Sequence, residues 1–398
     1  MPITMLDSGP TCSDHDGVPR LWSTIWAQWF PLQQSRKATA RKLTAANFVY
    51  EVADELHGTR SLDRFLCDGD VTSLKSVLSA VFFRLRNKAV KDGKNMGTQF
   101  DDAMRFVIDI LEKHREDESG EAVQDALTKL VYQYRDTNLN VNSAPPQIRA
   151  LPEEVINDLF EIFNPLSSRN PFRTIALRWR NFMFFLLLLE TGMRRGESAL
   201  LTSTSLYTQF DSRRQVNSFW LNIRQTVDED PRYEAPSLKT VNATRQIPVS
   251  ASLAAVMNLY ELEYRPQAYS EFFVISQKSN PISLRQLNQI LEVATKHLLD
   301  EVKESLARRG VQSVSCHELR HSCACMRLRR HLDQGLTLPA AQEKLRDFFG
   351  WSSDSNMPIY YSRAEFEPKA SETWNQVMDS TVAVLRRVGF NVAEADDA

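Results

Sequence analysis

A chain of 398 residues is long for one domain and predicts two or three. Its formal net charge of -2 neither indicates nor excludes a nucleic-acid partner, so only local runs of charge are informative. Five cysteines, an odd number, argue against a disulfide framework and indicate a reducing cytoplasm. The polar start lacks the pattern of a secretory signal, and the most apolar run, 182–189, is far shorter than the roughly 20 residues that cross a bilayer. A secreted or membrane-spanning protein is therefore not expected.

The amino-terminal part of the chain is expected to be helical after a disordered start. Residues 1–18 contain few large apolar residues and several Gly and Pro, which predicts disorder. Over 19–134, apolar residues recur every three or four positions, for example at Val77, Val81 and Leu85. This spacing places them on one face of a helix. The region therefore predicts an all-helical domain with its own core.

Basic residues gather in two runs of this helical domain. The run 34–42 contains no acidic residue, and the run 84–94 contains Asp92 as its only one. A solvated helix face explains either run by itself, but several runs in one chain favour contact with a polyanion. The candidate anion-binding residues are Arg36, Lys37, Arg41, Lys42, Arg84, Arg86 and Lys88.

A linker is expected between this domain and a second one of mixed structure. Residues 135–148 carry repeated Asn and two adjacent prolines, which is typical of an extended linker. Beyond it, "SFWLNIRQT" alternates apolar and polar residues as a strand does, and "TRQIPVS" is a short partner strand. Helices are expected before this small sheet and again after Ser283. The predicted fold class is mainly α with a small antiparallel β-sheet.

The stretch "CHELRHSCAC" fits two kinds of catalytic site. Read as H-E-x-x-H, it places His317 and His321 on one helix face as zinc ligands, with Glu318 as the base. The glycine and third histidine of the extended zinc motif are absent, however, and Arg320 would put a permanent cation beside the metal. Read as H-x-x-R-H, the stretch puts an imidazole and a guanidinium one turn apart, as phosphate chemistry requires. We therefore expect phosphate chemistry and no metal.

Other groups that metal-free phosphodiester cleavage needs occur in the same half of the chain. Arginine suits a phosphate because its planar fork donates two hydrogen bonds and stays charged. "ETGMRRGESALL" provides Arg194 after a Thr-Gly turn, and "SLKTVNATRQIP" provides Lys239 between the two expected strands. "FFGWSSDSNMPIYYS" provides Trp351 and then two tyrosines. Cations, an acid and a nucleophile are therefore all present.

In chain order, these segments resemble the motif boxes of the tyrosine recombinases, the family of phage integrases and chromosome-dimer resolvases. "TGMRRGE" is similar to the first arginine box, T-G-x-R-x-x-E, and "HELRHSCA" to the second, H-x-x-R-H. "FGWSSDSNMPIYYS" resembles the closing box, L-G-H-x-S-x-x-T-T-x-x-Y. The resemblance covers residues of about 149–365, over half of the chain. Each box alone is weak evidence, whereas the boxes together in family order are specific.

The resemblance implies a catalytic domain at 149–365 that cleaves and rejoins DNA strands through a 3′-phosphotyrosyl intermediate. Arg194 and Arg320 would clamp the scissile phosphate, and Tyr360 would attack it. Lys239 would protonate the leaving 5′ oxygen. No metal, nucleotide or other cofactor is implied, because the phosphotyrosine conserves the energy of the bond for rejoining.

The other residues of the boxes would support this chemistry. His317 would act as the base or as a hydrogen-bonding partner. Trp351, where the family more commonly has histidine, would donate its indole N–H to a phosphate oxygen. Glu197 would orient its neighbours, and His321 would satisfy a buried polar network.

Two of these assignments have an adjacent residue as the alternative. The family spacing from Trp351 leads to Tyr360, but Tyr361 follows directly and also carries a phenol. Likewise Arg195 follows Arg194, and the register of the first box favours Arg194. Both alternatives stay open at the level of the sequence.

The resemblance also implies partners and surroundings. The helical domain at 19–134 would bind DNA and, together with the catalytic domain, would clamp double-stranded DNA. The segment 366–398, a helix and an acidic tail, would dock on a neighbouring subunit to give a homotetramer on two DNA sites. The alternative is that this helix packs back on its own domain. Accessory proteins are further expected partners, and no membrane is expected.

The expected function is therefore that of a cytoplasmic, nucleoid-associated site-specific recombinase of a bacterial mobile genetic element. Two other classes stay open. One is a DNA-binding regulator whose catalytic site is impaired, and the other is a zinc peptidase that uses the H-E-x-x-H reading. A nicking-closing topoisomerase would share the chemistry without requiring a specific DNA site.

Overall fold

The chain folds into two compact units, Met1–Pro146 and Gln147–Ala398, each with its own hydrophobic core. The structure is a computed structural model. No helix that it describes is both long and apolar enough to cross a membrane. It describes residues 4–6, 9–30, 36–114, 129, 132, 149–212, 215–225, 230–232, 235–236, 238, 243–268, 270–353, 355–362 and 370–390.

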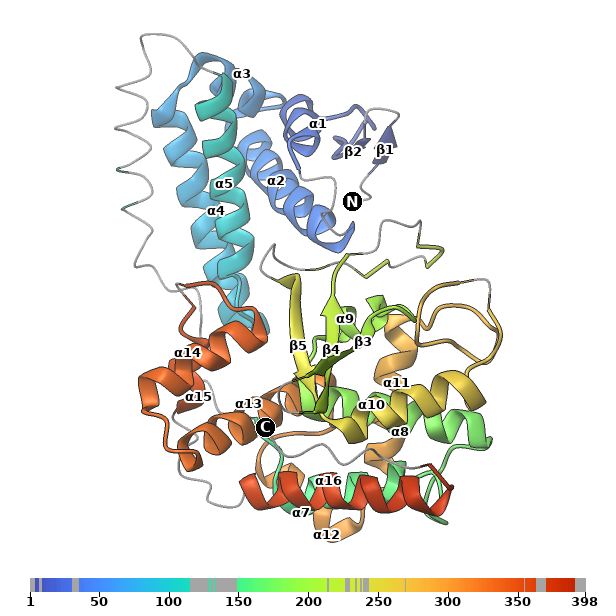
Figure 1. The fold of residues 1–398 in the computed structure, drawn as a ribbon. Helices are drawn as coiled ribbons and strands as arrows, with labels where there is room; N and C mark the ends of the chain where they lie inside the picture. The colour runs from blue at the N-terminus through green and yellow to red at the C-terminus, as the bar shows by residue number, and fades with distance from the viewer. Residues whose placement is uncertain are drawn as a thin grey trace. The chain divides into compact units, whose positions relative to one another are not determined.

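The first unit is a helical bundle. Its core lies where α2 packs against α4 and α5, and the expected stripe of Val77, Val81 and Leu85 is fully buried there. The linker expected at 135–148 lies outside the described residues. The helices of this unit, coloured blue to green-blue in Figure 1, are α1 (Leu21–Gln28), α2 (Arg36–His57), α3 (Ser61–Asp68), α4 (Val71–Asp92) and α5 (Gly97–His114).

In the described part of the amino terminus, for which the composition predicts disorder, the chain forms two short strands. Strands β1 (Thr4–Leu6) and β2 (Gly9–Thr11) pair in antiparallel fashion. The buried Cys12 donates its thiol to the carbonyl oxygen of Leu43 on α2 at 3.1 Å, and its own carbonyl accepts the amide of Arg20 at 2.8 Å. Contacts with later helices thus order a segment whose own composition predicts none.

The second unit combines a small sheet with many helices. Every residue of the apolar run 182–189 is buried in α8 (Ile175–Thr191), so this run forms a core helix. The other helices are α7 (Glu153–Phe163), α9 (Arg195–Leu200), α10 (Ala251–Leu259), the π-helical turn η2 (Tyr260–Tyr264), α11 (Leu284–Lys296), α12 (Asp300–Arg308), α13 (Cys316–Asp333), α14 (Leu338–Phe349), α15 (Met357–Ser362) and α16 (Ala370–Arg387).

The sheet has the antiparallel order β3-β4-β5 (Figure 1). Its strands are β3 (Leu206–Asp211), β4 (Val216–Ile223) and β5 (Arg245–Val249), and Leu221 lies opposite Ile247. Both predicted strands are thereby confirmed. Edge strand β3 was not predicted, because much of it stays partly exposed and it lacks a clear apolar alternation. The predicted fold class, mainly α with a small antiparallel sheet, is confirmed.

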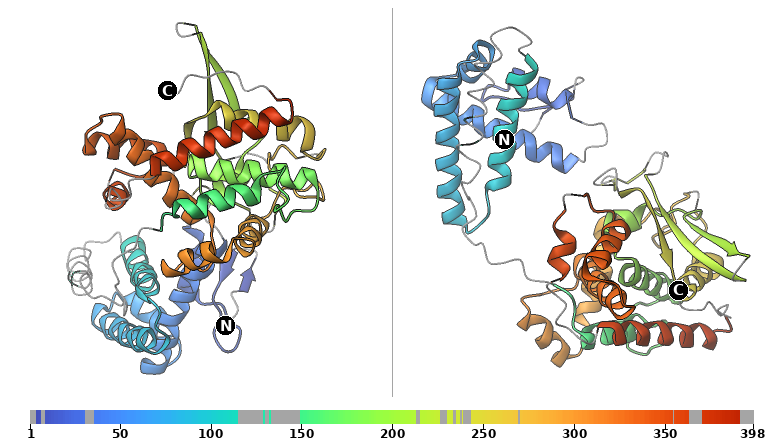
Figure 2. Two further views of the ribbon diagram at one scale, coloured as in Figure 1. Left: turned by 90° about the horizontal axis from the view of Figure 1, so that it is seen from below. Right: turned by 60° about the vertical axis from the view of Figure 1, so that its left-hand side comes forward.

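Helix α16 packs within its own unit. Trp374, Val377 and Leu385 on its apolar face are buried in the main core of that unit. The helix contacts α7, α10 and α13 (Figure 2). In this structure its apolar face is therefore used inside one chain, which was the alternative to docking on a neighbour.

Candidate active site

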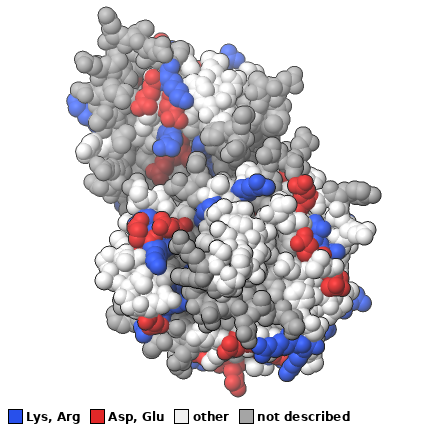
Figure 3. Space-filling model, viewed as in Figure 1, with Lys and Arg blue, Asp and Glu red and all other residues white. Residues whose placement is uncertain are grey.

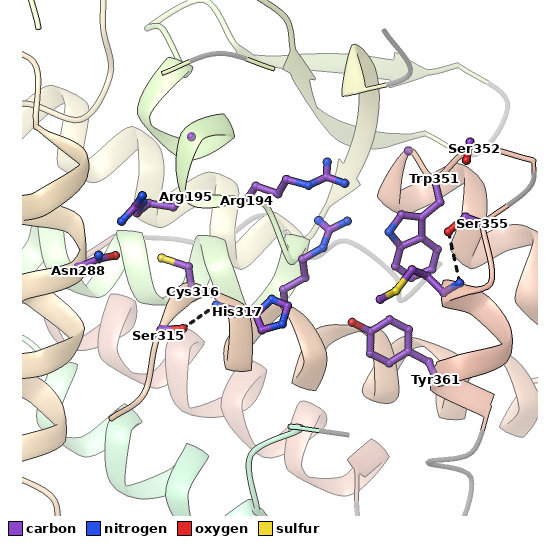
Figure 4. A pocket seen from close by; sticks show the side chains of 14 residues that line it. Arg194, Arg195, Asn288, Ser315, Cys316, His317, Trp351, Ser352, Ser355 and Tyr361 are labelled. Atoms are coloured by element: carbon purple, nitrogen blue, oxygen red, sulfur yellow. Dashed lines mark hydrogen bonds between the residues drawn. The ribbon is translucent and has the colours of Figure 1, made fainter. Parts of the chain in front are cut away.

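A pocket in the second unit gathers residues that are far apart in the sequence. It has a volume of about 690 Å³, and its walls come from α9, α11, α13, α15 and the segment between α14 and α15. Of the predicted catalytic residues, Arg194, His317 and Trp351 line it (Figure 4). Arg320 lines it as well. Arg195 lines it too. Lys239 lies outside the described residues.

Arg194 enters the pocket because of the tight turn that precedes it. Gly192 ends α8 with φ +56, and a Cβ on Gly192 would lie 2.5 Å from Cε1 of Phe349. Only glycine permits this turn and this approach. Arg194 follows and starts α9, where its backbone N–H donates to Glu197 Oε2 at 3.0 Å and its Nη1 to Glu197 Oε1 at 2.6 Å. The guanidinium is fixed at one edge and remains 26% exposed toward solvent.

Glu197 joins two arginines, one of which the sequence analysis missed. Its side chain is 2% exposed, and its Oε2 also accepts Nη2 of Arg245 at 3.0 Å. Burial raises the pKa of this carboxyl, but Arg245, with Arg320 and Arg194 behind it, holds the pKa below its usual range. The carboxylate therefore stays ionised. Arg245 gave no signal in the sequence beyond its place at the start of a predicted strand, where a basic residue usually faces solvent.

Arg320 is a buried cation on the second turn of α13. Its Nη1 donates to the carbonyl oxygen of Gly192 at 2.6 Å, and its Nη2 to that of Phe349 at 3.2 Å. The guanidinium also lies over the rings of Phe349 and Trp351. Burial, and then the neighbouring charge of Arg194, lower the pKa of Arg320 to about 10. The group remains charged at neutral pH, and this local excess of positive charge favours an anion in the pocket.

The two histidines of "HELRH" form a pair along α13. His317 is exposed on the pocket side, whereas His321 is buried, and their Nε2 atoms lie 2.9 Å apart. Burial, and then His317, lower the pKa of His321 to about 4. His321 is therefore neutral near pH 7, and its ring nitrogen fixes the orientation of the exposed imidazole of His317.

The zinc reading of the same stretch does not fit the geometry. Glu318, its supposed base, caps α13 instead: its Oε2 accepts the backbone N–H of Ser315 at 3.0 Å, and Arg149 lies 3.7 Å from its Oε1. The carboxylate is buried in this role. Among the described residues, no group of three or more His, Cys, Asp and Glu side chains could hold a metal ion.

Trp351 closes the other side of the pocket (Figure 4). Gly350 caps the end of helix α14, and its φ of +61 turns the chain so that Trp351 faces back toward the pocket. The indole is stacked between Phe349, at 4.8 Å between ring centroids, and Tyr361, at 5.5 Å. The ring is held rigidly beside Arg320.

The adjacent tyrosines of α15 occupy different environments. Tyr361 lines the pocket, is fully buried, and has a hydroxyl with no hydrogen-bond partner in the part of the chain that the structure describes. Burial raises the pKa of its phenol. Tyr360 is half-buried, is not among the residues that line the pocket, and has its ring centroid 5.8 Å from that of His321. Neighbouring helix residues point about 100° apart, so the two phenols face different ways.

The basic runs of the first unit are partly offset by acids from elsewhere in the fold. Arg41 pairs with Asp102 and Arg84 with Glu55, each at 2.7 Å. Figure 3 shows both signs of charge side by side on the face in view. The remaining candidates differ: Lys42 lies over the ring of Phe30 at 4.5 Å, Arg86 and Lys88 are exposed on α4, and the side chains of Arg36 and Lys37 lie outside the described residues.

Solved structures similar to this one are recombinases. The XerH site-specific recombinase bound to palindromic difH substrate matches with a TM-score of 0.50 and 13% identity, over 85% of this chain and 80% of that one. The Tn1549 transposon integrase in complex with transposon right end DNA matches with a TM-score of 0.41 and 15% identity, over 82% of this chain and 99% of that one. A lambda integrase dimer bound to a COC′ core site matches with a TM-score of 0.41 and 14% identity, over 86% of this chain and 94% of that one. The XerH match supports the fold, and the two weaker matches carry no further argument.

No curated protein sequence matches this chain. The model of the phage integrase family, however, matches residues 149–367, which is more than half of the 398 residues. This range contains the pocket and all three boxes that resemble those of the tyrosine recombinases. The chain belongs to the phage integrase family.

Proposed function

We propose that this protein is a site-specific DNA recombinase that cleaves and rejoins DNA strands through a 3′-phosphotyrosyl intermediate. The observation that carries the proposal is the convergence of Arg194, Arg320, His317 and Trp351 on one pocket. Helix α15, which carries the adjacent Tyr360 and Tyr361, borders this pocket through Tyr361. The family membership and the similar XerH recombinase, which is bound to its difH substrate, support it.

In the proposed reaction, the two arginines bind the scissile phosphate. Arg194 presents the exposed part of its guanidinium to the phosphate. Arg320 is buried, so water screens its positive charge only weakly. Preorganised cations of this kind stabilise the charge that develops on the phosphate oxygens in the transition state. The indole N–H of Trp351 is a further donor on the same side.

The bond changes balance without an added reactant. The tyrosine oxygen forms a bond to phosphorus while the bond from phosphorus to the 5′ oxygen breaks, and the phenolic proton passes to His317. Lys239 gives a proton to the departing 5′ oxygen. Reversal of these steps with the 5′ hydroxyl of another strand rejoins the DNA, so neither a metal nor ATP is needed.

We propose Tyr360 as the attacking residue. The spacing from Trp351 leads to it, and its half-buried side chain can reach a phosphate outside the protein. Tyr361 is the alternative, favoured by its place in the pocket wall, but its ring is fully buried in an apolar cluster and stacked on Trp351. A phenol in that setting would have to leave its packing before it could meet a duplex.

The partner in this proposal is double-stranded DNA. The helical part of the first unit, 19–134, would bind the duplex largely through phosphate contacts, for which the exposed Arg86 and Lys88 are the strongest described candidates. The catalytic domain would span 149–365, joined to the first by the segment 135–148. We further propose that the protein acts on the nucleoid as a homotetramer on two DNA sites.

Trapping of a covalent adduct tests the proposal. The purified chain is incubated with a library of duplex sequences, and the DNA that stays attached after protein denaturation is sequenced. We expect attachment at one sequence, through a 3′ phosphate on tyrosine, with no loss in excess EDTA. Binding without any adduct would instead establish the impaired regulator, and adducts at many unrelated sequences would establish a topoisomerase. Loss of activity on chelation, restored by zinc, would establish a metal-dependent enzyme.

A further inference from the structure

Arg245 is a buried arginine that touches the site from behind. Its side chain is 7% exposed, and it is not among the residues that line the pocket. Its Nε donates to the carbonyl oxygen of Phe348 at 2.9 Å, its Nη1 to that of Ala243 at 2.9 Å, and its Nη2 to Glu197 Oε2 at 3.0 Å. One side chain thus joins the end of α14, the start of β5 and the first turn of α9.

The contact with Glu197 decides how much charge Arg194 can offer to a phosphate. The carboxylate of Glu197 carries one negative charge and lies among three arginines, so the group has a net charge of +2. If Arg245 were neutral, the same carboxylate would be offset by Arg194 and Arg320 alone, and the net charge would fall to +1. Because Glu197 and Arg245 are both buried, water screens this change only weakly.

The contact with Phe348 links Arg245 to the side of the pocket that Trp351 forms. Arg245 binds the carbonyl of Phe348, and Arg320 binds that of the next residue, Phe349. These consecutive carbonyls end α14, and Trp351 follows two positions later. The position of the Trp351 wall relative to α9 therefore depends on two arginines that reach it from different elements.

We propose that Arg245 is a positioning residue of the strand-cleavage reaction: it offsets the charge of Glu197 and orients that carboxylate, so that Glu197 cancels less of the positive charge that Arg194 directs at the scissile phosphate. The inference rests on the proposed function. Arg245 itself touches neither the phosphate nor the attacking phenol and acts through Glu197.

The test uses the full chain and a synthetic duplex of the sequence recovered by adduct trapping. Single-turnover cleavage and equilibrium binding are measured for Arg245→Gln, Glu197→Gln and the double variant. We expect Arg245→Gln to slow cleavage about 100-fold, because the uncompensated charge of Glu197 then weakens the stabilisation that Arg194 gives to the phosphate, with binding changed by no more than about twofold. Adding Glu197→Gln should recover about tenfold, because it removes the charge that Arg245 no longer offsets.

A substrate with a neutral phosphate separates this role from a structural one. With a methylphosphonate at the scissile position, the demand on the charge of Arg194 falls, so the defect of Arg245→Gln should shrink several-fold. A purely structural defect would slow both substrates equally. Arg265→Gln is the matched control, because Arg265 also donates to three carbonyls of the same unit, those of Ser270, Phe272 and Phe273, and should leave both rates unchanged.

The outcomes are separable. A double variant no faster than Arg245→Gln, or an equal defect on both substrates, overturns the role of Arg245 while adducts of the unaltered chain still support the proposed function. No adduct with the unaltered chain overturns the proposed function itself. If a thermal melt shows that Arg245→Gln does not fold, Arg245→Lys takes its place. It keeps the charge and should cleave within about tenfold of the unaltered chain, and a larger loss counts against the inference.

Discussion

The cations proposed to act in catalysis and those proposed to contact the DNA backbone are held in opposite ways. In the second unit, Arg320 and Arg245 are buried and donate to backbone carbonyls, and Glu197 pairs with both Arg245 and Arg194. In the first unit, Arg86 and Lys88 stand exposed on α4. Fixed, buried cations suit a transition state, since they are not reorganised when charge develops. Exposed cations suit the DNA backbone, where they supply affinity that salt weakens.

The contrast also explains why charge counting in the sequence is a poor guide. The run 34–42 has no acid within it, yet the fold brings Asp102 to Arg41. Around the pocket the reverse holds, since one carboxylate serves three arginines. The same residue type is therefore partly neutralised in one unit and left in excess in the other.

The largest expected effect is the loss of the covalent adduct when the attacking tyrosine is replaced. Tyr360→Phe should bind DNA normally and form no covalent adduct, because it removes the attacking oxygen and leaves Arg194 and Arg320 in place. Tyr361→Phe is the control and should still form the adduct. Digestion of the trapped complex and identification of the modified peptide provide the measurement. A phosphotyrosine on Tyr361, or an adduct that persists in Tyr360→Phe, would assign the attack to the pocket-wall tyrosine.

The next effect tests the two arginines that line the pocket. Arg194→Lys and Arg320→Lys should each slow cleavage by about 100-fold or more, because an ammonium cannot reproduce the bidentate fork. Their affinities for DNA should change little, because most affinity comes from other phosphate contacts. Single-turnover rates and equilibrium binding provide the two measurements. Cleavage at the normal rate in Arg194→Lys would point to Arg195 as the clamp, and a matching test of Arg195→Lys would follow.

A smaller effect is expected from the exposed cations. The double variant Arg86→Ala and Lys88→Ala should lower the slope of log affinity against log salt by about 2, since each phosphate contact contributes about 0.9. The cleavage rate of bound DNA should not change. Arg41→Ala should lower the slope less, because Asp102 already offsets that charge. An unchanged slope in the double variant would place the duplex on another face of the first unit.

The smallest effect concerns stability. His321 has a folded-state pKa of about 4 against an ordinary value of 6.5, because it is buried. The unfolded chain therefore binds an extra proton between these values, and stability should fall as pH drops from 6.5 toward 4, by at most about 1.4 kcal/mol per pH unit. Denaturant unfolding at pH 7 and at pH 5 measures the change in the free energy of unfolding. His321→Asn should reduce this pH dependence, whereas His297→Asn, at an exposed site, should retain it in full.

Local patterns determined the secondary structure and the residue types of the site. The alternation in "SFWLNIRQT" reflects a strand with one buried face, so a short window was sufficient to predict it. The unbroken apolar run of α8 reflects a helix that is buried on every side. The boxes were readable for a related reason: phosphate chemistry requires particular side chains at short, fixed spacings. The structure then brings Arg194, His317, Arg320 and Trp351 to one pocket.

Only the tertiary structure decided which groups are partners. Arg245 lies 48 residues from Glu197, and its role depends on a contact that no local window contains. Glu318 caps a helix although its motif also matches a zinc site, because Ser315 lies where the helix begins. Tyr361 faces the pocket although the spacing selects Tyr360, because packing against Trp351 sets the rotation of α15. The burial and the partners of a side chain depend on segments that are distant in the chain. Burial and partners in turn determine the protonation state of each group and its access to the pocket.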